Sequence, residues 1–208
     1  MGLPILIEGE SGAGKTYSIK NLDADAVGIF AVEKSRLPFK KAFRVAKNAN
    51  YGAIMKVLQN PTLKTYIIDD SQYLMVNEFF DRAKDTGYQK YTDIGLNFRN
   101  LVHFINHNLP DDVHVYFLHH TETDSNTGKT KAKTVGKMLD NYLTLEGCFN
   151  IVLQAVAEGK EHYFITQSDG YNTAKSPEDM FDVKIPNDLA LVDKTIREYY
   201  KEESDENK

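Results

Sequence analysis

Hydrophobic positions along the chain form short apolar runs, separated by segments in which apolar residues recur every three or four positions. The runs predict strands at residues 3–8, 26–32, 65–68 and 113–118. The segments between them predict helices at 15–22, 51–59, 73–84 and 92–107. Strands that alternate with helices in this way build a mainly parallel sheet with helices on both faces.

The second half of the chain departs from this alternation. Residues 150–157 and 162–166 predict two strands joined through a turn at Gly159, which gives a C-terminal antiparallel hairpin. Helices are expected at 135–145 and 189–200, and a polar loop at 121–133. With no repeat or linker, we expect a single α/β domain over residues 1–200. An acidic, disordered tail is expected at 201–208.

A complete phosphate-binding motif, G-x-x-x-x-G-K-[ST], lies between the first strand and the first helix. Its glycines let the backbone curl so that N–H groups face phosphate oxygens, and the helix N-terminus adds partial positive charge. Lys15 is expected to reach the β- and γ-phosphates, and the Thr16 hydroxyl to bind Mg²⁺. The predicted nucleotide-binding residues are Gly9, Glu10, Ser11, Gly12, Ala13, Gly14, Lys15, Thr16 and Tyr17.

An apolar strand that ends in carboxylates follows about 50 residues later, at Asp69-Asp70. The end of such a strand lies beside the magnesium of phosphate-loop enzymes, at the carboxyl edge of the sheet. Asp69 is therefore the expected Mg²⁺ ligand, and Asp70 is the second choice. Hydrolysis also needs a group that orients water, and Glu33 and Asp70 both end strands and compete for that role.

His119 and His120 end the fourth strand, which is expected to lie next to the strand of the phosphate loop. A polar side chain there can sense the γ-phosphate. A metal site is less favoured, because adjacent residues of a strand point to opposite faces.

Two segments have residues suited to single-stranded DNA. Lysines that recur in and beside a flexible loop fit phosphodiester contacts, and aromatic residues beside a lysine fit base stacking. The residues are Lys129, Lys131 and Lys133 in the first segment, and Tyr88, Lys90 and Tyr91 in the second. A solvated charge run and a packed turn are the structural alternatives.

Composition narrows the function classes only slightly. Of 208 residues, 41% are apolar and 26% charged, which is ordinary for a globular domain. The net charge of −5 weighs mildly against nucleic-acid binding, although local patches decide that question. No apolar run approaches the roughly 20 residues that span a bilayer, so we expect no membrane partner. A single cysteine fits a cytoplasmic protein.

Several segments together resemble the phage AAA-domain nucleotide-binding proteins, which are small RecA-like ATPases, some regarded as single-strand-annealing recombination proteins. The resemblance covers residues 3–182. It rests on G-E-S-G-A-G-K-T, V-E-K-S-R-L-P-F, I-I-D-D-S-Q-Y-L-M, V-Y-F-L-H-H-T-E, G-K-M-L-D-N-Y-L-T-L-E-G and A-K-S-P. The first and third segments are shared with phosphate-loop proteins in general, and the others are more specific.

The resemblance implies roles for individual residues. Glu33 would activate water, His120 would couple nucleotide to DNA with His119 as the second choice, and Lys175 would reach a neighbouring subunit's nucleotide. Residues 87–91 and 121–133 would be the DNA-binding loops. RecA-type recombinases usually have an N-terminal docking segment, but here the first strand begins close to Met1. This argues against a RecA-like filament but not against other homo-oligomers.

These observations favour an Mg²⁺-dependent ATPase with a RecA-like fold that acts on single-stranded DNA in phage recombination or replication. The acidic tail is a candidate contact for a single-strand-binding protein. The first alternative is a small phosphotransferase, which would need an acceptor pocket and usually an arginine-rich lid. The second is a helicase-loader-type AAA+ switch, for which only Arg197 could serve as the sensing arginine. A nucleotide-gated module without turnover is the non-enzymatic alternative.

Overall fold

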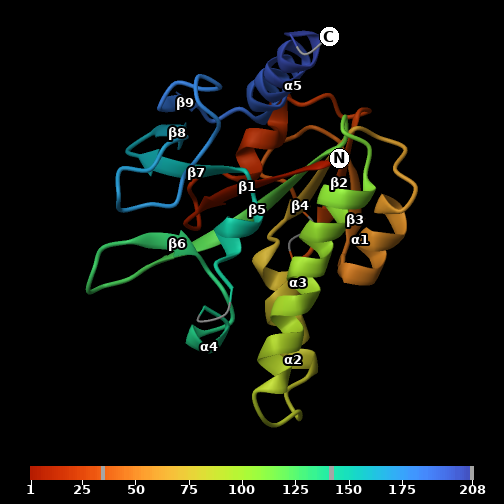
Figure 1. Cartoon of the computed structure of the whole chain (residues 1–208), viewed down its shortest axis with the longest axis vertical. Coiled ribbons are helices and arrows are strands. Elements are labelled where there is room, and N and C mark those ends of the chain that lie inside the picture. The colour runs from red at the N-terminus through yellow and green to blue at the C-terminus, as the bar shows by residue number, and fades with distance from the viewer. Residues whose placement is uncertain (34–35, 141–142, 207–208) are drawn as a thin grey trace.

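The computed structural model describes residues 1–33, 36–140 and 143–206. The described part contains nine strands in one sheet, in the order β3-β2-β4-β5-β1-β7-β8-β9, with β6 paired to β5 (Figure 1). The strands are β1 Leu3–Gly9, β2 Val27–Ala31, β3 Arg44–Lys47, β4 Thr65–Asp69, β5 His114–Thr123, β6 Thr130–Ala132, β7 Ile151–Glu158, β8 Glu161–Ile165 and β9 Lys184–Pro186.

Six strands run parallel, from β3 to β7 along the sheet, whereas β8, β9 and β6 pair antiparallel. The predicted α/β architecture, with a mainly parallel sheet and a C-terminal hairpin of β7 and β8, is confirmed. Parallel neighbours bring their carboxyl ends to one edge, so β1, β4 and β5 deliver the phosphate loop, Asp69 and His120 to the same place.

Helices cover both faces of the sheet, because alternate residues of each buried strand are apolar on opposite sides. Leu6 of β1 packs in the cluster covered by α1 Tyr51–Leu58, α2 Gln72–Asp81 and α3 Gln89–Asn108. Ile5 and Ile7 pack on the other face, beneath the 3₁₀ helix η1 Thr16–Asn21 and α5 Leu189–Glu206. In Figure 1, α2 and α3 project together from one side of the sheet.

Several expectations about local structure were wrong. The helix expected at 15–22 is the short 3₁₀ helix η1. The loop expected at 121–133 is confined to residues 124–129, since the residues on either side of it pair as a two-stranded ribbon of β5 and β6. The strands of the ribbon could not be predicted from the hydrophobic pattern, because the ribbon projects from the sheet and has polar residues on both faces (Figure 1). Strands β3 and β9 were not predicted.

The helix expected at 135–145 is reduced to the single turn α4 Lys137–Asp140 and a 3₁₀ turn, η2 Leu145–Cys148. Residues 141–142, which fall between these two turns, lie outside the described residues. The tail expected to be disordered from 201 instead continues α5 to Glu206, since its glutamates and lysine are good helix formers. None of the described helices is long and apolar enough to cross a bilayer.

Candidate nucleotide-binding site

The phosphate loop leaves β1 at Gly9 and enters η1 at Thr16. Gly12 and Gly14 have φ angles of 85° and 95°, a region that L-residues rarely adopt. A Cβ on Gly14 would lie 2.9 Å from His162 Nδ1, whereas a Cβ on Gly12 would have nothing within 4 Å. Both glycines are therefore required by the backbone, and Gly14 is also required by packing.

The Lys15 ammonium lies inside the curl of the loop. Its Nζ donates hydrogen bonds to the carbonyl oxygens of Gly9, at 2.7 Å, and Glu10, at 2.8 Å, and the residue is only 6% exposed. These bonds point the ammonium at the strand–loop junction, beside the N–H groups of the loop. The position matches the one that the sequence motif requires of a lysine that contacts phosphate.

Thr16 and Asp69 meet across the strand that separates them. The Thr16 hydroxyl donates to Asp69 Oδ1 at 2.9 Å, although β5 lies between β1 and β4 in the sheet. Burial, and then the neighbouring Asp70, raise the pKa of Asp69 to about 6, against opposing effects of Thr16 and Lys15. A hydroxyl and a carboxylate together are the protein ligands that Mg²⁺ commonly takes when phosphates supply the rest.

Asp70 and His120 form a second polar pair at the same edge of the sheet. His120 Nε2 donates to Asp70 Oδ1 at 3.2 Å, and the Tyr73 ring meets the imidazole edge-on. Asp70 has a φ of 58°, a conformation that Asp tolerates better than most residues and that turns its side chain away from the line of β4.

His119 points the other way and has a structural role. It is fully buried, with Nδ1 2.9 Å from the Ser71 hydroxyl and Nε2 2.8 Å from the Lys133 carbonyl oxygen. A carbonyl only accepts, so Nε2 carries the hydrogen and Nδ1 accepts from Ser71 in the neutral ring. Burial lowers the pKa of His119 to about 4. Of the two candidate sensors, only His120 therefore lines the site.

The phosphate loop and these polar residues surround one cavity of about 360 Å³. The lining comprises Ser11, Gly12, Gly14, Lys15, Thr16, Tyr17, Arg36, Pro38, Asp69, Asp70, His120 and His162. The cavity thus joins six of the nine predicted nucleotide-binding residues to the predicted metal ligands. Of the other three, Gly9 and Ala13 are buried in the loop, and Glu10 faces a neighbouring groove.

That neighbouring groove, of about 940 Å³, begins where the cavity ends and shares Ser11 and His120 with it. It runs between α2 and the β5–β6 ribbon. Tyr73, Phe79 and Phe80 line one side. Phe80 is 66% exposed, which is unusual for a phenylalanine on a folded surface.

Two residues with roles implied by the family resemblance lie outside the cavity. Glu33 is exposed just beyond β2 and does not belong to the described lining. Lys175 is half-buried and pairs through its backbone with Val152, near the start of β7, whereas the phosphate loop lies at the far ends of the strands. The roles of both residues stay predictions.

The aromatic segment expected to bind DNA forms the turn between α2 and α3 and the first turn of α3. Tyr88 is 76% exposed, whereas Lys90 is only 7% exposed. The Lys90 ammonium donates to the Arg82 carbonyl oxygen and lies 4.4 Å from the centre of the Phe79 ring. Lys90 therefore braces the helix pair, and its placement argues against the predicted contact with DNA. Tyr91 packs against Phe79.

The three lysines of the segment expected to bind DNA differ in exposure and in ion pairing. Lys129 and Lys133 are exposed on the β5–β6 ribbon. The Lys131 ammonium instead makes ion pairs with Asp140, at 2.6 Å, and Glu122, at 3.3 Å, so its charge is already compensated. Two of the three predicted lysines are thus exposed, and their contact with DNA stays a prediction.

Sequence patterns missed three residues at or beside the site. Arg36 lines the cavity from the V-E-K-S-R-L-P-F segment, in which the sequence indicated no role for it, and His162 lines it from a segment with no motif. Glu8 is fully buried in β1, accepts a 2.6 Å hydrogen bond from the Thr173 hydroxyl, and leaves Oε2 without a partner among the described atoms. Burial raises the pKa of Glu8 to about 8. A carboxylate within an apolar run was the only sequence signal for it.

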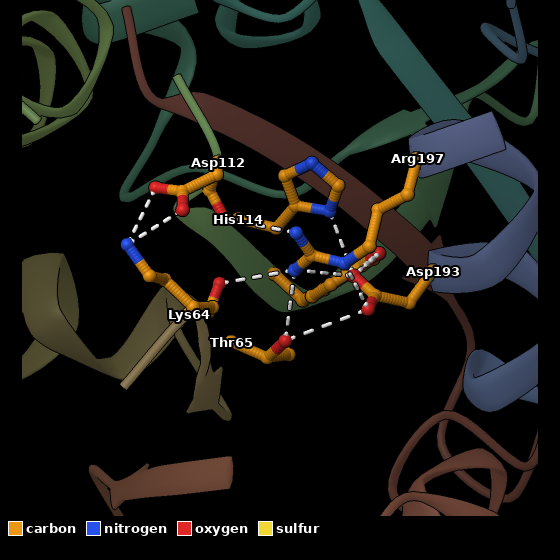
Figure 2. A network of polar contacts seen from close by, with 7 residues as sticks. Lys64, Thr65, Asp112, His114, Asp193 and Arg197 are labelled. Atoms are coloured by element: carbon orange, nitrogen blue, oxygen red, sulfur yellow. Dashed lines mark hydrogen bonds and ion pairs between the residues drawn. The ribbon is translucent and has the colours of Figure 1, made fainter. Parts of the chain in front are cut away.

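A second polar cluster lies at the opposite end of the strands (Figure 2). Asp193 of α5 accepts hydrogen bonds from His114 Nδ1 at 2.7 Å, Tyr116 at 2.8 Å and Arg197 Nε at 2.8 Å. Arg197 also donates to the Lys64 and Asp112 carbonyl oxygens. The cluster fastens α5 to the amino ends of the strands. These hydrogen bonds also hold the Arg197 side chain far from the phosphate loop.

Comparison with known proteins shows similarity in backbone structure only. The sequence matches no protein-family model and no curated protein. Among solved structures, the chain is similar to an ATPase domain, with a TM-score of 0.44 and 14% sequence identity over 78% of this chain and 75% of that one. The functional assignment therefore depends on the geometry of the cavity around Lys15, Thr16 and Asp69.

Proposed function

We propose that the chain is an Mg²⁺-dependent ATPase that acts on single-stranded DNA. The observation that carries the ATPase assignment is the hydrogen bond between Thr16 and Asp69 beneath the phosphate loop. Thr16 and Asp69 would hold Mg²⁺, which neutralises charge on the β- and γ-phosphates when bound. A triphosphate in the loop would take over the Lys15 ammonium from the Gly9 and Glu10 carbonyls.

Two carboxylates compete for the role of orienting the attacking water. Asp70 lines the cavity and is fixed by His120, which supports a role at the γ-phosphate end. Glu33, which the family resemblance favours, is exposed outside the lining. The two variants Asp70→Asn and Glu33→Gln separate the roles. The catalytic one keeps nucleotide affinity and loses turnover, since orientation of water acts on chemistry more than on binding.

The DNA part of the proposal is supported by how the site connects to the β5–β6 ribbon. Ser71 follows the metal-binding strand and bonds His119, which in turn donates to the carbonyl of Lys133. His120, on the same strand as His119, contacts Asp70. A change at the γ-phosphate can thus reach a ribbon that carries the exposed Lys129 and Lys133. We further propose a homo-oligomer, and a single-strand-binding protein as a partner of the chain's acidic end.

The test is the rate of ATP hydrolysis and the oligomer mass, each measured with and without single-stranded DNA. For the wild type we expect stimulation by DNA, and DNA binding that weakens steeply with salt, because phosphate contacts release counterions. Lys15→Ala should abolish hydrolysis in both conditions. A hydrolysis rate that stays flat across a DNA titration would reject the DNA role while leaving the ATPase intact.

The groove beside the cavity supports one alternative, a phosphotransferase. Its aromatic wall of Tyr73, Phe79 and Phe80 meets the γ-phosphate end at His120, where an acceptor molecule would have to sit. Transfer of labelled γ-phosphate to a small acceptor, instead of release as inorganic phosphate, would establish this function. The AAA+ switch is disfavoured, since its only candidate arginine, Arg197, is bound to Asp193 at the other end of the sheet.

A further inference from the structure

Among the described residues of the β7–β8 hairpin, His162 is the one that reaches the nucleotide cavity. It lies near the start of β8, and its Nδ1 is 3.2 Å from the carbonyl oxygen of Ala13, inside the phosphate loop. The same nitrogen is the atom that a Cβ on Gly14 would strike. The imidazole is therefore held against the loop, with the rest of the ring exposed.

This contact fixes which ring nitrogen carries the hydrogen. A carbonyl oxygen can only accept, so Nδ1 must be the donor toward Ala13. In the neutral ring, Nε2 is then left as an acceptor. His162 thus offers the cavity a lone pair of fixed position, and an N–H group on a ligand is the complementary partner.

The position of His162 indicates which part of a nucleotide it would meet. Asp69, Asp70 and His120 mark the metal and γ-phosphate end of the cavity, and Lys15 serves the β- and γ-phosphates. The remaining lining that is not phosphate loop consists of Tyr17, Arg36, Pro38 and His162. The sugar and base must leave the loop toward these residues.

Two of these residues are suited to a base. Tyr17 is 42% exposed, and its ring is braced by Phe39 edge-on and by the Lys20 ammonium, 4.5 Å from the ring centre. Arg36 has an exposed guanidinium, a group that stacks on aromatic planes. Stacking is tolerant of base identity, because every base has a π-face. Discrimination between bases therefore falls to hydrogen bonding.

We propose that His162 Nε2 selects nucleotides whose base carries an amino group at C6 of a purine or C4 of a pyrimidine, and so favours ATP over GTP. Adenine and cytosine present an amino donor where guanine and uracil present a carbonyl oxygen. Two acceptors facing each other cannot bond, and each loses its water. The inference rests on the proposed binding of a nucleoside triphosphate in the phosphate loop, and extends it to the choice of base.

Inosine triphosphate is the sharpest probe, since it has a carbonyl in place of the amino group of ATP. Calorimetry gives the dissociation constants of ATP and inosine triphosphate with Mg²⁺. The ratio of the two constants measures how strongly the protein prefers an amino group over a carbonyl at this position of the base. For the wild type we expect ATP to bind about tenfold more tightly, the usual size of one hydrogen bond.

The variant His162→Asn separates base selection from support of the loop. The amide nitrogen of asparagine occupies nearly the position of Nδ1 and keeps the bond to Ala13, but nothing replaces Nε2. We expect the ratio to fall to about one through loss of ATP affinity. An unchanged ratio in His162→Asn would overturn the inference, as would equal weakening of both nucleotides. Equal binding of both by the wild type would also overturn it, yet leave the proposed ATPase standing. If the wild type bound neither nucleotide, both the inference about His162 and the proposed ATPase function would be wrong.

Discussion

The hydroxyl of Thr16 and the carboxylate of Asp69 lie 2.9 Å apart although 53 positions separate them in the sequence. They come from strands that are not neighbours, because β5 runs between β1 and β4. The fold thus assembles the pair by aligning three parallel carboxyl ends, and it buries Asp69 to 3% exposure in doing so. A divalent cation at this position would offset the cost of that burial.

Removing either partner should weaken Mg²⁺-dependent nucleotide binding. For Thr16→Ala and for Asp69→Asn we expect a loss of about tenfold or more, because each removes one oxygen ligand from the same ion. The double variant should lose less than the product of the two single losses, since both act on one site. Thr16→Ser, which keeps the hydroxyl, is the control. Multiplicative losses in a titration with Mg²⁺ would argue that the two side chains act independently.

The two left-handed glycines of the loop offer a matched pair of variants. Gly14→Ala and Gly12→Ala impose a similar backbone penalty of about 1–2 kcal/mol at positive φ. Only the first also drives a Cβ to within 2.9 Å of His162 Nδ1. We expect Gly14→Ala to reduce ATP affinity clearly more than Gly12→Ala does. Equal affinities in a binding titration would show that the His162 contact does not constrain the loop.

His119 and His120 should separate into a structural and a functional residue. Burial lowers the pKa of His119 to about 4, below its ordinary value of about 6.5. Its neutral form therefore contributes stability that is fully present above pH 6.5 and is lost as the pH falls toward 4. His119→Ala should lower the free energy of unfolding by about 2–3 kcal/mol at pH 7.5, since it takes the buried donor from the Lys133 carbonyl and leaves the Ser71 hydroxyl with the Leu118 carbonyl as partner.

His120→Ala should instead leave the free energy of unfolding within about 1 kcal/mol of the wild type, because His120 is partly exposed and, among the described residues, its side chain hydrogen-bonds Asp70 alone. It should abolish the stimulation of ATP hydrolysis by single-stranded DNA. Urea unfolding and hydrolysis assays on both variants check the pair. If both variants kept the stimulation by single-stranded DNA, His120 would not couple the nucleotide site to DNA as proposed.

Much of the site could be predicted because its pattern is local. Residues 9–16 are consecutive, and the chemistry of glycine, lysine and threonine specifies their roles. Asp69 was found because an apolar strand that ends in acid has a fixed place in such sheets. His162 was missed because only the return of β8 past the phosphate loop brings it to Ala13, and no spacing in the sequence records that contact.

The errors in local structure have the same origin. The β5–β6 ribbon has two polar faces, so it lacks the alternation that identifies a half-buried strand. Lys90 looked like a surface cation beside aromatics, but the packing of α2 on α3 turns its ammonium onto Phe79. Both cases depend on tertiary contacts that composition does not contain.

The cluster that fastens α5 should be a large contributor to stability. Burial alone would raise the pKa of Asp193, but hydrogen bonds from His114 and Arg197 outweigh it and hold the pKa at about 2. Asp193→Asn should cost about 3–5 kcal/mol, because it leaves a guanidinium in the cluster without its anion. Asp112→Asn, in an exposed pair with Lys64, should cost less than about 1 kcal/mol. Similar unfolding free energies for the two variants in urea would contradict this ranking.

Glu8 predicts an unusual dependence of stability on pH. Burial first, and then the nearby Glu146, raise the pKa of the Glu8 carboxyl to about 8, against the opposing hydrogen bond from Thr173. A carboxyl with a raised pKa contributes stability that is complete below its ordinary value near 4.5 and is lost as the pH rises to about 8. The wild type should therefore lose on the order of 5 kcal/mol over that range through this group.

Glu8→Gln keeps an oxygen for Thr173 and cannot ionise, so it should remove this loss. We expect the variant to match the wild type near pH 5 and to exceed its free energy of unfolding at pH 8.5 by about 4–5 kcal/mol. The exposed Glu178→Gln serves as a control and should shift neither value. Urea unfolding at the two pH values measures the effect. A variant that is less stable than the wild type at both would mean that Glu8 is ionised in the folded protein and bound to a cationic partner.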